Sequence, residues 1–180
     1  GAWATSTTIF HGGAQSVVDV YGLDADDVLV TSAPIDLARI PNAVLGFWQI
    51  PYLEGSSWDN GFVEASTDGG LTWVELAAYN KYDCTPVPTS ASVLTNEAWI
   101  YSEIDLSMYG NQVVSIRFRL ESDGSVLYAG WALDDIEVFS APNWLDLGMV
   151  MGSIPGGENV DAPVHFNSLG VPLGVHAAEV

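Results

Sequence analysis

The sequence predicts an all-β protein, folded as an antiparallel β-sandwich or barrel. Short β-prone runs recur at intervals of roughly 8–15 residues, and Gly, Pro, Asn and Asp residues separate them. No stretch of useful length has the 3.6-residue periodicity of an amphipathic helix. The clearest strand covers residues 113–120, where apolar residues alternate with Ser115, Arg117 and Arg119. Such alternation places one face of a strand on a core and the other face in solvent.

The first part of the chain contains four expected strands. Residues 3–10 are rich in Thr and Ser, which is typical of an edge strand, and residues 16–21 form the next candidate. Residues 28–32 follow, and Pro34 ends this run because proline cannot donate to a ladder. Residues 43–50 are nearly all apolar, which predicts a central strand buried on both faces.

Residues 62–74 predict a β-hairpin. Its turn has the spacing Ser-x-Asp-x-Gly-x-Thr-Trp, and this spacing resembles the Asp-box, in which Asp and Ser brace the turn and Trp packs beneath it. The five matching residues are Ser66, Asp68, Gly70, Thr72 and Trp73. Sialidases carry one Asp-box in each propeller blade. This chain has one copy and no blade-length repeat, so we interpret the hairpin as structural.

The second half of the sandwich begins after a long irregular stretch at 79–96, of the kind that is often functional or flexible. Strands are then expected at 99–106, 113–120, 126–131 and 133–139. Beyond residue 141 the composition changes, and 144–151, 160–167 and 174–180 predict three further strands between Gly and Pro turns. About forty residues cannot bury enough surface to fold alone. We therefore expect part of a second domain, or an extension of the first.

The balance of charge excludes several kinds of partner. The chain has 23 acidic and four basic residues, for a formal net charge of −19, and 48% of its residues are apolar. This field repels phosphate backbones and anionic membrane surfaces, so we expect no nucleic-acid binding and no membrane insertion. Bound cations would relieve the repulsion, and Ca²⁺ prefers carboxylate and carbonyl ligands. A surface solvated by salt water explains the same charge without a bound metal.

A family resemblance is carried by an ordered set of residues: Trp3, His11-Gly12-Gly13, 24–37, Leu45-Gly46-Phe47-Trp48, the 63–73 hairpin, 104–110, 114–119 and 130–138. In this order the chain resembles the MAM-like jelly-roll modules of bacterial extracellular proteins, which are appended to immune-inhibitor-A-like peptidases and to choice-of-anchor proteins. The resemblance covers roughly residues 1–140. It implies a non-catalytic extracellular or cell-surface module, often calcium-stabilised, for adhesion, carbohydrate contact or positioning of a catalytic partner.

Two domains follow from this resemblance: a MAM-like jelly roll at 1–140, and a partial Ig-like β segment at 141–180, which is similar to the opening strands of Ig-like repeats. A typical module has an extra strand before the position of Trp3, and a typical Ig-like repeat continues past Val180. We therefore expect a fragment of a longer parent protein, or a chain whose missing strands come from a neighbouring subunit by strand addition.

Acidic residues at two expected strand ends are the best candidates for a metal site. One group precedes the strand at 28–32 and the other begins the strand at 133–139; together they are Asp24, Asp26, Asp27, Asp134 and Asp135. Ends of jelly-roll strands can lie close together, and oxygen ligands from two loops suit Ca²⁺. Asp residues at strand ends also cap backbone N–H groups without any metal.

Aromatic residues raise the possibility of carbohydrate binding. Four tryptophans lie within strand patterns and are expected in the core: Trp48, Trp73, Trp99 and Trp131. Trp58, Tyr79 and Tyr82 lie in loops and are the candidates for a surface that stacks on sugar rings. The alternative for these three is an ordinary packed rim.

The sequence offers no support for catalysis. It contains no Gly-x-Ser-x-Gly, no His-Glu-x-x-His and no Gly-rich phosphate loop. Cys84 is the single cysteine and has no catalytic context. We therefore expect a non-enzymatic accessory or adhesion module. Two alternatives stay open: a carbohydrate-binding module, and a structural subunit of an extracellular assembly completed by strand addition.

Overall fold

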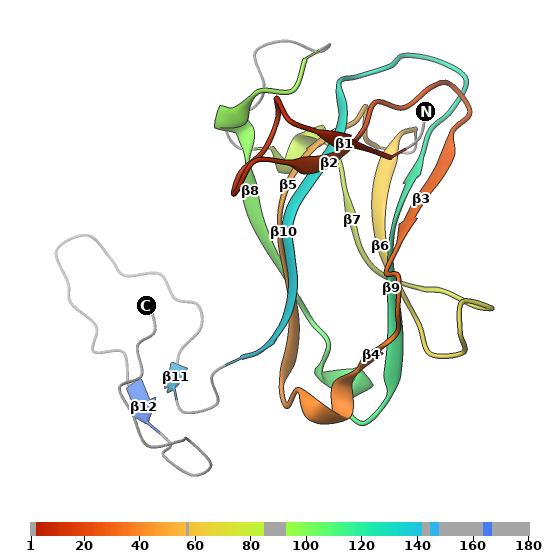
Figure 1. Cartoon of the computed structure of the whole chain (residues 1–180). Helices are drawn as coiled ribbons and strands as arrows, with labels where there is room; N and C mark the ends of the chain where they lie inside the picture. The colour runs from red at the N-terminus through yellow and green to blue at the C-terminus, as the bar shows by residue number, and fades with distance from the viewer. Residues whose placement is uncertain (1–2, 57, 85–92, 142–144, 148–163, 167–180) are drawn as a thin grey trace, which may run out of the picture.

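The protein is an all-β sandwich, shown here as a computed structural model (Figure 1). The structure describes residues 3–56, 58–84, 93–141, 145–147 and 164–166. One sheet has the order β1 (Ala4–Ser6), β2 (Ser16–Asp19), β10 (Gly130–Ser140), β5 (Ala43–Tyr52) and β8 (Ile100–Asp105). The other has the order β3 (Asp26–Val30), β9 (Val113–Glu121), β6 (Asn60–Ser66) and β7 (Val74–Tyr79), with β4 (Ile35–Asp36) also on β9.

All strand pairs in the two sheets are antiparallel, and the strand order is that of a jelly roll. The chain crosses repeatedly between the sheets, with β6 and β7 as a hairpin within the second sheet, so β2-β10-β5-β8 faces β3-β9-β6-β7. The only helices in the described residues are four single 3₁₀ turns: Leu37–Arg39, Lys81–Asp83, Asn96–Ala98 and Ser107–Tyr109. The predicted all-β jelly roll is confirmed.

The main core lies between the sheets and is built around Trp131. This side chain is fully buried, and its Nε1 donates to Gln49 Oε1 at 2.9 Å. Phe118 meets it edge-on with ring centroids 5.8 Å apart. Gly61 lies beneath the indole ring, where a Cβ atom would come within 2.5 Å of ring carbons. Close packing at this point therefore depends on a residue without a side chain.

A second, smaller core covers the outer face of the first sheet. Ile50 and Ala132 point away from the main core and pack with Trp99 and Cys84, which come from the irregular segment between β7 and β8. This cover explains why β5 is buried on both faces, as its apolar run predicts. Burial is the main cause that raises the pKa of the Cys84 thiol to about 12, and the nearby negative charge of Asp83 raises it further.

The hairpin of β6 and β7 has the braced turn that its spacing predicts. Asp68 Oδ1 accepts from the backbone N–H groups of Leu71 and Thr72 at 3.0 Å, and Ser66 Oγ accepts from Gly70 N at 2.8 Å. Hydrogen bonds from Thr72 to Asp68, together with that from Ser66, lower the pKa of Asp68 to about 2. The turn is therefore held by its own residues.

Three details of the sequence interpretation are wrong. Trp73 is not in the core, because it lies on the outer face of the second sheet with the Arg117 guanidinium 4.4 Å from its ring centroid. Trp48 is only half-buried, on the outer face of the first sheet, whereas Trp99 and Trp131 are buried as expected. The expected separate strands at 126–131 and 133–139 are replaced by one long strand that begins at Gly130.

Beyond Ala141 the structure describes only β11 (Leu145–Leu147) and β12 (Val164–Phe166), which pair with each other. The predicted Ig-like segment at 141–180 lies mostly outside the described residues and stays a prediction.

Among the described residues, no helix has the length and apolar character needed to span a bilayer.

Candidate metal centre

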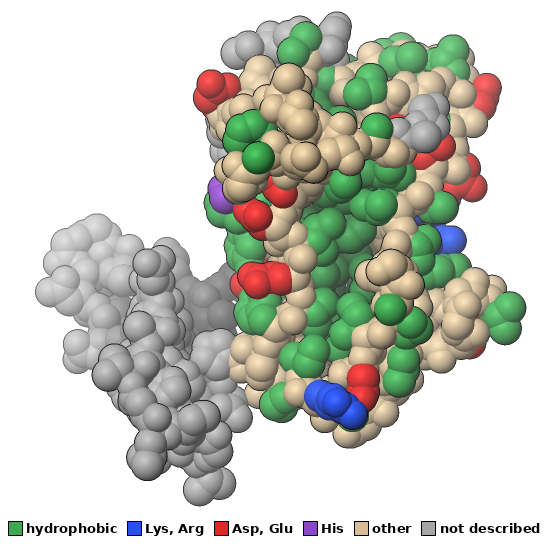
Figure 2. Space-filling view, in the orientation of Figure 1, with side chains coloured by type: hydrophobic (Ala, Val, Ile, Leu, Met, Phe, Trp, Pro, Cys, Tyr) green, Lys and Arg blue, Asp and Glu red, His purple; other side chains and the backbone are tan. Residues whose placement is uncertain are grey.

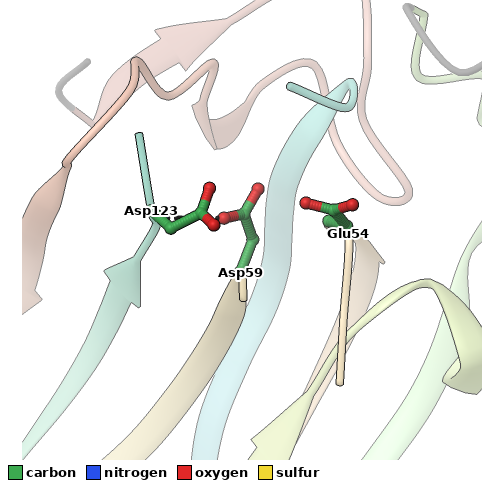
Figure 3. A group of neighbouring side chains, drawn as sticks. All are labelled: Glu54, Asp59 and Asp123. Carbon is green, nitrogen blue, oxygen red and sulfur yellow. Dashed lines mark hydrogen bonds between the residues drawn. The ribbon is translucent and has the colours of Figure 1, made fainter. Parts of the chain in front are cut away.

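Three carboxylates meet at one end of the sandwich (Figure 3). Glu54 follows β5, Asp59 precedes β6, and Asp123 follows β9. One carboxylate oxygen from each residue lies within 4.8 Å of the other two. The group therefore joins the loop between β5 and β6, which connects the two sheets, to the loop between β9 and β10, which also connects them.

A tight turn places Glu54 and Asp59 on the same side of their loop. Gly55 and Ser56 have positive φ angles of 85° and 60°, and Gly55 N donates to the Asp59 carbonyl at 2.9 Å. A side chain at Gly55 would also come within 2.8 Å of Asn80 Oδ1. The turn therefore requires glycine at this position, and it brings the two acidic side chains together.

Asp59 is fully buried and is held by two donors. Its Oδ2 accepts from the Tyr21 hydroxyl at 2.6 Å, and its Oδ1 accepts from Asp123 N at 3.0 Å. Burial, followed by the hydrogen bond to Asp59, raises the pKa of Tyr21. Tyr21 therefore stays a proton donor to this carboxylate at neutral pH.

Asp123 is fixed by the loop that follows it and by the loop before β3. Its Oδ1 accepts from Ser125 N at 2.8 Å, and its carbonyl accepts from Asp24 N at 2.8 Å. The neighbouring Ser122 hydroxyl donates to the Gly22 carbonyl and accepts from Ala25 N, each at 2.8 Å. These bonds hold Asp123 in place from two directions.

Glu54 is the least satisfied member of the group. Its Oε2 is buried and has no hydrogen-bond partner among the described residues. Lys81 lies close enough for its charge to interact with Glu54, but its Nζ donates to Tyr128 Oη at 2.8 Å and lies 4.2 Å from that ring's centroid. The hydrogen bond to Tyr128, and to a lesser degree the charge of Glu54, raise the pKa of Lys81. None of the ion pairs among described residues involves Glu54, Asp59 or Asp123.

An all-oxygen group with three carboxylates and no paired base could hold a metal ion. Hard divalent cations prefer such ligands, and loops from different strands suit the flexible coordination of Ca²⁺. The sequence interpretation did not identify these three residues. The signal in the sequence is weak: Glu54 and Asp59 are separated by four residues that begin with a turn-forming Gly-Ser pair, and Asp123 lies in a segment that predicts only a turn.

The acidic residues that the sequence suggested as ligands lie in two separate regions. Asp134 and Asp135 hold the turn after β1: Asp134 Oδ2 accepts from His11 N at 2.7 Å, and Asp135 Oδ2 lies 2.9 Å from His11 Nδ1. The His11 ring stacks on Trp48 with centroids 3.7 Å apart. These contacts match the alternative interpretation, in which Asp residues cap backbone groups.

The remaining three candidates lie around β3. Asp24 has a positive φ of 53° and lies beside Gly124, and Asp26 Oδ1 is 3.4 Å from Arg119 Nη1. Asp27 lies beside Asp19 of β2, which is fully buried. Burial and then the charge of Asp27 raise the pKa of Asp19 to about 6. Metal binding by Asp24, Asp26, Asp27, Asp134 or Asp135 stays a prediction.

The candidate sugar-stacking residues divide into two kinds. Trp58 and Tyr82 are 56% and 70% exposed, and both lie against the Gly55 turn: Trp58 N donates to the Gly55 carbonyl, and the Tyr82 ring is the third-nearest neighbour of a Cβ at Gly55. Tyr79 instead packs edge-on against Phe47 of the main core, with centroids 6.0 Å apart. Trp58 thus belongs to the loop that carries Glu54 and Asp59, and the Tyr82 ring lies against this loop at Gly55.

The fold and this acidic group define a jelly-roll module with a candidate metal centre where its loops meet. No family model matches the chain. The chain is 28% identical over 130 residues to bacillopeptidase F of Bacillus subtilis (strain 168), a match that covers 68% of this chain and 8% of that protein. The chain thus corresponds to a small part of this relative.

Two solved structures show a distant likeness. The glycoside hydrolase domain of Endo-D from Streptococcus pneumoniae R6 has a TM-score of 0.49 and 13% identity, covering 82% of this chain and 22% of that chain. TmCBM61 in complex with β-1,4-galactotriose has a TM-score of 0.42 and 19% identity, covering 77% of this chain and 88% of that chain. Neither likeness is close enough to bear on function.

Proposed function

We propose that this chain is a non-catalytic accessory domain of a larger extracellular protein, stabilised by Ca²⁺ bound to Glu54, Asp59 and Asp123. The relative supports the first part, because the matched region is a small segment of a much longer protein. The resemblance to MAM-like modules of bacterial extracellular proteins points to the same location and role. The chain's partners are then the other domains of its parent protein.

The described reactive groups are engaged in structural contacts, which supports a non-catalytic role. His11 is stacked on Trp48 and bound to Asp135. Cys84 is buried, and its raised pKa of about 12 keeps the thiol protonated at neutral pH. Neither group is arranged as the nucleophile and base of a catalytic pair.

One observation carries the calcium proposal: Glu54 Oε2 is buried without a partner, beside the carboxylates of Asp59 and Asp123. Clustered carboxylates repel one another, and a buried acceptor without a donor is costly. A divalent cation offsets both effects. Because the three residues come from loops that connect the two sheets, the ion would tie the sheets together at this end.

Thermal unfolding with and without calcium tests this proposal. We expect saturating Ca²⁺ to raise the melting temperature by several degrees and EDTA to reverse the rise, since a ligand at 100 times its Kd stabilises by about 2.7 kcal/mol. Glu54→Gln should lose this response, and Glu75→Gln, at an exposed residue of β7, should keep it. A wild-type melting temperature that neither Ca²⁺ nor EDTA changes would contradict the proposal.

A second candidate function is carbohydrate binding at the same loop. The exposed side chains of Trp58 and Tyr82 favour it, because aromatic faces stack on sugar rings; Trp58 lies in the loop between Glu54 and Asp59, and the Tyr82 ring lies against Gly55 of the same loop. A polysaccharide array probed with calcium and again with EDTA tests it. We expect binding that Trp58→Ala abolishes and that Leu71→Ala, at the 85% exposed tip of the Asp-box hairpin, leaves intact. Equal binding by both variants would rule out this surface.

A further inference from the structure

Strand β10 has a paired neighbour on one side only as far as Leu133. β2 pairs only with Trp131, Ala132 and Leu133, whereas β5 pairs with β10 as far as Ser140. The same point marks a change in burial, since residues 131–133 are buried and residues 135–137 are exposed. Beyond Leu133, the backbone edge of β10 has no strand beside it among the described residues.

An apolar groove runs along this unpaired edge. A cavity of about 280 Å³ lies between β10 and the segment from the end of β3 to Ile40; Ile35, Ile40 and Val138 contribute to its walls. Leu45 and Ile116 also line it, and both belong to the main core and are only 1% exposed. The groove therefore opens directly onto the interior of the sandwich.

A second cavity extends the groove toward the end of β2. It has a volume of about 270 Å³, shares Ile136 with the first, and is lined also by Leu133, Asp134 and Asp135. Figure 2 shows the hollow between the two sheets lined with hydrophobic side chains, with acidic side chains along one border. The acidic residues beside the β10 edge are Asp134, Asp135 and Glu137.

We propose that this groove binds an extended peptide strand that pairs with the free edge of β10. An open strand edge presents unpaired N–H and C=O groups, which another strand satisfies. In such a strand alternate side chains point the same way, so one set enters the apolar groove. Lys or Arg residues in the peptide would lie near Asp135 and Glu137 at the border.

The charge of the groove selects this occupant over a second copy of the chain. Two copies paired through β10 would bring their acidic borders together, and each copy carries a net charge of −19. The bulge between Asp134 and Glu137 and the acidic side chains are also features that keep an edge from pairing with its own kind. After the bulge, residues 137–140 keep regular register with β5, so this part of β10 can accept a strand.

Peptide binding by fluorescence anisotropy tests the proposal. The probe is a labelled peptide of about ten residues with alternating Val and Thr and a Lys pair at each end, long enough to follow the groove. We expect binding that weakens when the Lys residues are replaced by Glu, and at higher salt. Ile136→Arg should reduce affinity at least about tenfold, whereas Val28→Arg, at a similarly exposed position on β3, should not.

A charge reversal keeps the test independent of how well Ile136→Arg folds. Glu137→Lys should lower affinity for the Lys-ended peptide and raise it for the Glu-ended one. Equal affinities of wild type and Ile136→Arg, or no binding of the Lys-ended peptide to the wild type, would overturn the proposal. So would a concentration-dependent dimer in sedimentation that Ile136→Arg abolishes, because the occupant would then be a second copy. Binding must persist in Glu54→Gln, since the groove does not depend on the metal centre.

Discussion

Asp19 is fully buried inside the sandwich beside Asp27, and burial, the charge of Asp27 and a side-chain hydrogen bond with Asp27 all favour its protonated form. Its pKa is raised to about 6 in the folded protein, from 3.8 in an unperturbed chain. The folded state therefore holds a proton that the unfolded chain releases at lower pH. Protonation of Asp19 favours folding, so its contribution to stability is complete below pH 4 and is lost as the pH rises through 6.

We predict that Asp19 makes the free energy of unfolding fall by about 2–3 kcal/mol between pH 4 and pH 7. The Asn side chain resembles the protonated carboxyl group and does not titrate, so Asp19→Asn should remove this part of the pH dependence. Urea unfolding at a series of pH values measures it. Asp68→Asn is the matched control, because Asp68 has a pKa of about 2 and stays ionised throughout this range. An unchanged slope in Asp19→Asn would contradict the prediction.

The metal centre shows how far single residues could be predicted. The expectation of an acidic cation site among the loops was reasonable, but the residues that meet are Glu54, Asp59 and Asp123. Asp134 and Asp135 lie at the expected strand start, where their carboxylates contact His11, and metal binding by them stays a prediction. Which loops of a jelly roll lie together depends on strand order, and local sequence patterns carry no information about it.

At the scale of elements, β10 begins at a position where glycine is required. Gly130 has a φ of +109°, and a Cβ atom there would lie 2.1 Å from the backbone oxygen of Asp19. The positive φ disfavours any residue with a side chain. The close approach to the Asp19 carbonyl means that backbone atoms of β2, rather than a flexible side chain, would have to move to make room for a Cβ atom.

We predict that Gly130→Ala lowers the free energy of unfolding by about 3 kcal/mol or more. Gly69→Ala is the control, because Gly69 also has a positive φ of 76° but has no atoms near the position of a Cβ. It should cost only about 1–2 kcal/mol, the penalty of the backbone conformation alone. Chemical denaturation of both variants compares them. Equal losses would show that β2 moves aside at little cost.

Strands could be predicted where apolar and polar residues alternate, and a strand was wrongly predicted where a side chain, not a neighbouring strand, accepts the backbone hydrogen bond. The alternation in 113–120 predicts β9 almost to its ends, and the apolar run 43–50 predicts the doubly buried β5. The expected strand at 126–131 is wrong for its first four residues. There, Tyr128 N donates to the hydroxyl of Tyr21, 107 positions away in the chain, and no local pattern signals such a partner.

At the scale of the whole molecule, every basic residue is already engaged. Arg117 and Arg119 converge on Glu64, with Nε–Oε2 distances of 2.6 and 3.3 Å, and Arg39 pairs with Asp36. Lys81 is bound to Tyr128. No further Lys or Arg side chain is therefore left to neutralise the large excess of carboxylates. Any added salt will screen their repulsion, so the calcium response must exceed that of sodium at equal ionic strength.

Cys84 can serve as a natural probe of local opening in the smaller core. It is the single thiol in the sequence, 2% exposed within the smaller core, and its pKa of about 12 leaves almost no reactive thiolate at neutral pH. A thiol reagent can therefore react only when the cover over the outer face of the first sheet lifts. The labelling rate, compared with that of the unfolded chain, gives the free energy of this opening separately from that of global unfolding. The natural cysteine therefore measures local opening over the first sheet without any engineered probe.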